Sequence, residues 1–164
     1  MPPRFVRGGD VVAWHGSAYD LRTRTRRRLE PDAEPTACDG RTLALRAYDG
    51  LDHVVRVVPL EGGAEQLTFR LDRRAGEHPV FAVRHGIGYL MSYPRTDGAA
   101  RLLALDLRSA KRRTKSLLVL EGPHHRPPLR HNQVPVPHLM TDAALVIWTG
   151  ADWETLPWLE AWPE

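Results

Sequence analysis

Four histidines lie close together in one Pro-rich stretch, at 121–138, and they are the residues here whose type best suits a metal ion. They are His124, His125, His131 and His138. Imidazole nitrogens bind zinc, nickel and copper. However, their spacing matches no recurrent motif, no cysteine lies nearby, and the carboxylates Glu121 and Asp142 only bracket the group. We therefore expect no metal and no other cofactor, and interpret the stretch as a loop.

This loop is the first candidate contact surface. Its prolines favour an extended, preformed backbone that can dock on a partner, and its side chains Arg126, Arg130 and His131 would make the contacts. A second candidate lies at the C-terminal end, where Trp158 and Trp162 are flanked by Pro157 and Pro163. Aromatic rings carry large contact areas, so we predict these five residues to bind a partner.

No arrangement of residues predicts a named reaction. Ser17 and Ser92 follow turns but lie in no nucleophile-elbow pattern. Cys38 stands beside Asp39, whose carboxylate would disfavour a thiolate.

An alternative is that turn residues form a ligand site. The protein would then bind a sugar or another small molecule, or act as a hydrolase. These residues follow strands or sit in turns, and we expect them to converge near one end of the fold; they are His15, Asp49, His85 and Asp97.

Composition limits the class of protein. Hydrophobic residues make up 42% and charged residues 26% of the 164 residues, which is ordinary for a globular chain and argues against a disordered one. The length suits one domain over 1–164. A single cysteine indicates a reducing compartment. No signal-like segment or spanning apolar run is present, so the sequence predicts a cytoplasmic protein with no membrane contact.

The basic residues are nearly all arginine. Of 23 Lys and Arg residues, two are lysines, which leaves 21 arginines. A GC-rich genome explains this bias without any function. The functional alternative is nucleic-acid binding by the basic segments 22–28 and 108–115. Against it, the aromatic residues do not interleave with the arginines along the chain, as a stacking platform would require.

The apolar segments are short, rich in β-branched and aromatic residues, and followed by Gly or Asp-Gly, which is typical of strands and turns. They are Val11–Trp14, Leu43–Tyr48, Val80–Val83 and Leu145–Trp148, with second strands at Ala18–Leu21, His53–Val58 and Gly88–Tyr93. Loops this short join antiparallel neighbours. Helical signals are weak because 14 Pro and 13 Gly interrupt most windows.

One motif recurs. Asp20-Leu21-Arg22-Thr23 matches Asp106-Leu107-Arg108-Ser109, and Pro59-Leu60-Glu61-Gly62 is a weaker copy. Asp suits the first position of a tight turn, where its carboxylate accepts a backbone N–H. These segments resemble β-propeller repeats of the kelch or quinoprotein type, in which a strand, a Gly turn and a second strand precede an Asp-(Leu/Pro)-x-Thr-Gly turn. Arg24 and Ala110 stand where that pattern has glycine.

The resemblance implies an all-β antiparallel meander of about four propeller-like blades, as a small ring or an incomplete one. A β-sandwich or open barrel is the structural alternative. The function that this predicts is a non-catalytic binding or scaffold module with a protein partner or a second copy of itself. The alternatives are the small-ligand site and the nucleic-acid binder described above.

Overall fold

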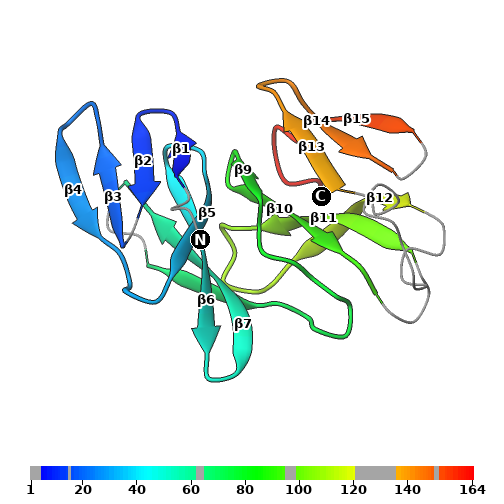
Figure 1. Ribbon diagram of the computed structural model, residues 1–164, viewed down its shortest axis with the longest axis horizontal. Helices are drawn as coiled ribbons and strands as arrows, with labels where there is room; N and C mark the ends of the chain where they lie inside the picture. The colour runs from blue at the N-terminus through cyan, green and yellow to red at the C-terminus, as the bar shows by residue number, and fades with distance from the viewer. Residues whose placement is uncertain (1–4, 15, 62–64, 95–98, 121–135, 150–151) are drawn as a thin grey trace.

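The computed structural model describes residues 5–14, 16–61, 65–94, 99–120, 136–149 and 152–164, with 136–139 described for the backbone alone. Within these ranges the chain forms β-strands and no helix (Figure 1). The strands lie in four antiparallel sheets, which we number I to IV along the chain. In the same ranges no helix is present that could cross a bilayer.

Each sheet is a simple meander in which neighbours along the chain are neighbours in space. Sheet I contains β1 (Val6–Gly8), β2 (Val11–Trp14), β3 (Ser17–Asp20) and β4 (Thr25–Arg28). Sheet II contains β5 (Glu34–Cys38), β6 (Thr42–Asp49), β7 (Asp52–Pro59) and β8 (Leu67–Arg70). Sheet III contains β9 (Ala82–Arg84), β10 (Ile87–Ser92), β11 (Ala100–Asp106) and β12 (Thr114–Leu120). Sheet IV contains β13 (Val136–Met140), β14 (Ala144–Trp148) and β15 (Trp153–Pro157).

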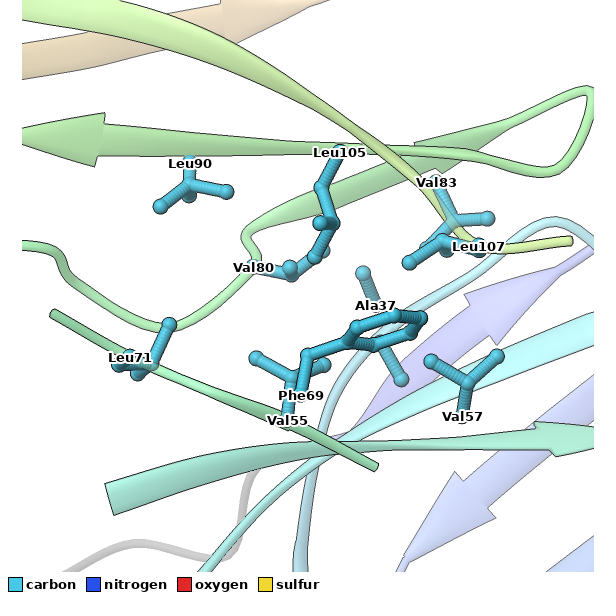
Figure 2. Close-up of a cluster of buried hydrophobic side chains, with 11 residues drawn as sticks. Ala37, Val55, Val57, Phe69, Leu71, Val80, Val83, Leu90, Leu105 and Leu107 are labelled. Carbon is cyan, nitrogen blue, oxygen red and sulfur yellow. The ribbon is translucent and has the colours of Figure 1, made fainter. Parts of the chain in front are cut away.

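The sheets follow one another around the molecule, with sheet I in blue and sheet IV in orange on either side of its upper part (Figure 1). Three apolar clusters lie between consecutive sheets: one between I and II, one between II and III, and one between III and IV. Figure 2 shows the middle cluster, in which Val55, Val57 and Phe69 of sheet II face Val80 and Leu105. The prediction of an all-β antiparallel meander is confirmed.

The number of neighbouring sheets that pack against a sheet explains its sequence pattern. Sheets II and III have apolar clusters on both faces, so their central strands bury residues on both sides: β7 is largely apolar, and all six residues of β10 are buried. In β7, Val54 and Val58 face sheet I while Val55 and Val57 face sheet III. Sheets I and IV are covered on one face, and β2 and β14 accordingly alternate between buried and half-buried residues.

The recurring motif occupies the same place in successive sheets. Asp20, Pro59 and Asp106 each end the third strand of their sheet. The next residue then donates its backbone N–H to the turn between the first two strands: Leu21 to Asp10, Leu60 to Arg41, and Leu107 to Gly86, at 2.8–3.0 Å. The Asp20 carboxylate accepts the N–H groups of Arg22 and Thr23, and the Thr23 bond lowers the pKa of Asp20. Arg24 adopts φ +56°, the conformation that favours glycine.

Two expectations need correction. A two-sheet sandwich does not match the four sheets found in the described ranges. The loop expected at about 121–138 also extends too far along the chain, because strand β13 begins at Val136. Proline is tolerated there since, within the described ranges, β13 pairs on one side only, with β14, and its ladder is irregular between Pro137 and Leu139.

Candidate anion-binding cleft

An open cleft of about 600 Å³ lies where turns of sheets II, III and IV meet. The turn between β5 and β6 contributes Asp39, Arg41 and Thr42, and the turn between β9 and β10 contributes His85 and Gly86. Arg84 of β9, Arg108 after β11 and Asp142 between β13 and β14 complete the lining. The first strands of sheets II, III and IV all end at this side of the molecule. The turns that follow them therefore lie close together.

The turns that form the cleft are fixed by local chemistry. The Asp39 carboxylate accepts the backbone N–H groups of Arg41 at 2.9 Å and Thr42 at 2.8 Å, which closes the turn between β5 and β6. Asp106 accepts the N–H of Arg108 at 3.0 Å in the same way. Gly86 has φ +73°, and a Cβ there would lie 2.3 Å from Nε of Arg108. The positive φ favours glycine at this position, and the flexible Arg108 side chain lies across the turn.

Three guanidinium groups and two carboxylates, those of Asp39 and Asp142, line the cleft, so its charge is net positive. The ion pairs in the described part of the chain use other arginines: Arg46, Arg56, Arg70, Arg112 and Arg113. Arg41, Arg84 and Arg108 have no carboxylate partner there. Arg84 instead lies over the Trp158 ring, 5.0 Å from its centroid, and donates to the Val83 carbonyl at 3.1 Å. The carboxylate of Asp39 is already engaged by its turn. The cleft therefore suits an anionic group, which Arg binds through two parallel N–H bonds.

A smaller cavity of about 210 Å³ lies between the first strands of the sheets. It is lined by Val6 and Arg7 of β1, Ala37 and Cys38 of β5, and Ala82 to Arg84 of β9, with Phe5, Thr36, Phe81 and Met140. In addition, β1 contacts β5 and β5 contacts β9. Residues of β1, β5 and β9 thus line one cavity, and Arg84 lines both this cavity and the cleft.

The structure separates the residues expected to form a ligand site. His85 lines the cleft, but Asp49 ends β6 while the cleft residue Thr42 begins it, so Asp49 lies at the opposite end of sheet II. There Asp49 pairs with Arg70 at 3.9 Å. The expectation that these two residues converge is wrong, because the eight-residue strand β6 lies between the two turns. His15 and Asp97 lie outside the described residues.

The residues predicted to bind a partner have different environments. Trp158 is 9% exposed and packs inside the chain against Tyr89, with ring centroids 4.8 Å apart, and Trp162 is half-buried beneath the guanidinium of Arg113. The ring of Trp158 is therefore not displayed to a partner.

The predicted contacts Arg126, Arg130 and His131 lie outside the described residues, as do His124 and His125. His138 is in β13. Among the side chains that the structure does describe, no three potential ligands lie together as a metal site requires.

Sequence reasoning missed Arg41 and Arg84 as site residues, and considered Arg108 only as part of a basic segment. Their one local signal is position: Arg41 and Arg108 each follow an Asp that begins a turn, two residues earlier, and Arg84 ends a strand before His85-Gly86. Which turns meet depends on sheet packing.

The chain matches no protein-family model, no curated protein and no solved structure with which it was compared.

Cys38 is expected to be unreactive in the folded protein. It is 4% exposed, and burial, reinforced by the charge of Asp39, raises the pKa of its thiol to about 11. At pH 8 roughly one thiol in a thousand is then ionised, against about a quarter for a free cysteine. We expect a disulfide reagent to modify Cys38 at least about tenfold more slowly in buffer than in denaturant. Equal rates would contradict this packing.

Proposed function

We propose that this chain is a non-catalytic, β-propeller-like binding module that acts as a subunit of a larger assembly. Four features support a propeller-like arrangement. Each sheet is a meander, consecutive sheets bury apolar clusters between them, and first strands line a common cavity. The same motif also ends the third strand in sheets I, II and III. Propellers use the turns at one end as a binding surface because those turns converge around the axis.

The observation that carries the proposed function is the cleft with its three arginines. A guanidinium is weakly hydrated for a cation, and an acidic side chain can replace its water with two aligned hydrogen bonds. Arginine is also enriched at protein interfaces, where it contributes a large share of the binding energy. The cleft is open and formed by turns from three sheets. We infer that it receives an acidic segment of a partner protein.

A charge reversal in the cleft tests this function. We expect Arg41→Glu to weaken binding of a fluorescent poly-L-glutamate peptide about tenfold, since one attractive contact becomes repulsive. Arg41 suits the test because it is exposed and its side chain has no ion-pair partner in the described ranges. Binding is measured by fluorescence anisotropy at two salt concentrations, and it should weaken with salt.

Arg74→Glu is the matched control. Arg74 is also exposed, but it follows β8 and so lies at the other end of the sheets. It changes the net charge by the same amount as Arg41→Glu. If both variants weaken the peptide equally, the effect is one of total charge and the cleft is not the site.

A further inference from the structure

The outer face of sheet I, which points away from sheet II, gathers aromatic rings and arginines from all four strands. Antiparallel pairing places opposite residues on the same face of a sheet. The residues of this face form two rows across the strands: Phe5, Trp14, Ser17 and Arg28 in one, and Arg7, Val12, Tyr19 and Arg26 in the other. We call these eight residues the basic aromatic face. Along the chain, these aromatic residues and arginines are largely separate, and only the strand register interleaves them.

Phe5 and Tyr19 are exposed, whereas Trp14 is half-buried. Phe5 and Trp14 stack with their centroids 5.3 Å apart and their planes 18° from parallel, and Phe5 is 67% exposed. Tyr19 is 36% exposed, with the guanidinium of Arg26 at 5.7 Å from its ring centroid. Nε of Arg26 donates to the Ser17 hydroxyl at 2.9 Å, which fixes that guanidinium over the sheet. The Tyr19 ring thus lies beside a cation that the sheet holds in place.

The charge of the face has one sign. Arg7, Arg26 and Arg28 are exposed, and none has a carboxylate partner among the described residues. The nearest acidic residue on these strands, Asp20, points to the other side because it pairs with the buried Val11. Positive charge is therefore not balanced within the face.

We propose that the basic aromatic face binds single-stranded nucleic acid. Unpaired bases would stack on Phe5, Trp14 and Tyr19, since every base has a π-face, and the arginines would neutralise phosphates. A duplex hides its base faces and would gain only the phosphate contacts. None of the eight residues lines the cleft, so the proposal does not rest on the function proposed above; Phe5 and Arg7 also line the smaller cavity described there.

The test is a binding titration with a fluorescent single-stranded oligonucleotide of about 12 nucleotides. We expect binding at low salt and a slope of log K against log salt of about −2, from three arginines at about 0.7 each. Tyr19→Ala should weaken binding about tenfold through lost stacking. Arg28→Gln should reduce the slope by about 0.7. A duplex of the same length should bind at least about tenfold more weakly.

Two control variants distinguish this face from other surfaces. Tyr48→Ala removes a ring that is 52% exposed at the end of sheet II, and Arg74→Gln removes an exposed charge elsewhere. Both should leave binding unchanged. No binding at low salt, equal losses in Tyr19→Ala and Tyr48→Ala, or equal affinity for duplex would each overturn the proposal. So would a native mass of two chains that Tyr19→Ala reduces to one, because a second copy would then cover the face.

Discussion

Replacing Trp158 by alanine lowers the free energy of unfolding by about 4 kcal/mol, the typical cost of deleting a buried tryptophan. The side chain joins the C-terminal segment to sheet III. Its ring meets Tyr89 edge-on, with planes 76° apart, and its Nε1 donates to the Thr141 carbonyl at 2.7 Å. The hydroxyl of Tyr89 accepts the backbone N–H of Leu159 at 2.9 Å. Removing the indole leaves a cavity and an unsatisfied carbonyl at once.

Trp153→Ala is the matched control for this prediction. Trp153 is 49% exposed and rests on Trp148, with ring centroids 4.9 Å apart. We expect its loss to cost less than about 1 kcal/mol. Urea unfolding followed by far-UV circular dichroism measures both variants without relying on tryptophan fluorescence. If both variants lose the same free energy of unfolding, Trp158 does not pack on sheet III. The prediction that it is an exposed partner contact would then stand.

Gly76→Ala is expected to lower the free energy of unfolding by about 3 kcal/mol and the melting temperature by about 9 °C. Gly76 has φ +61°, which costs alanine about 1 kcal/mol. A Cβ would also lie 2.2 Å from the backbone carbonyl oxygen of Tyr93. The two segments are held close together, because the N–H of Tyr93 donates to the Gly76 carbonyl at 3.0 Å. The end of sheet III must therefore move.

Gly50→Ala isolates the steric part of this effect. Gly50 has φ +62°, nearly the same as Gly76, but nothing lies within 4 Å of the position that an alanine methyl group would occupy. Alanine there incurs the conformational cost alone, about 1 kcal/mol. A difference of about 2 kcal/mol between the two variants in thermal and urea unfolding would therefore report the close approach to Tyr93. If the two variants are equally stable, the segment before β9 does not pack as the structure has it.

The two stability predictions and the two binding predictions test different levels of the molecule. Trp158 and Gly76 test the packing of consecutive sheets and the connection between sheets II and III. Arg41 tests the end of the fold where turns converge, and Tyr19 tests a face that the fold leaves uncovered. The stability results do not decide the binding results, because an exposed arginine or tyrosine contributes little to stability.

The strands predicted best are those whose neighbours along the chain are also their neighbours in the sheet. The predicted pair Val11–Trp14 and Ala18–Leu21 corresponds to β2 and β3, and His53–Val58 lies within β7. Several strands were missed, among them β1, β5, β8, β12, β13 and β15. β1 has three residues and β5 contains Pro35. These two are strands because they pair with β2 and β6, and their own residues carry no strong strand pattern.

Short antiparallel strands joined by tight turns can be predicted from the residues along the chain without knowledge of their packing. Glycine, proline and turn-forming aspartates act on the few residues beside them, through steric limits and backbone hydrogen bonds. Tertiary structure alone decided that Arg41, Arg84 and Arg108 line one cleft, and that Tyr19 lies between Val12 and Arg26 on one face. Those neighbours come from strand register and sheet packing, which depend on burying apolar side chains that are far apart in the chain.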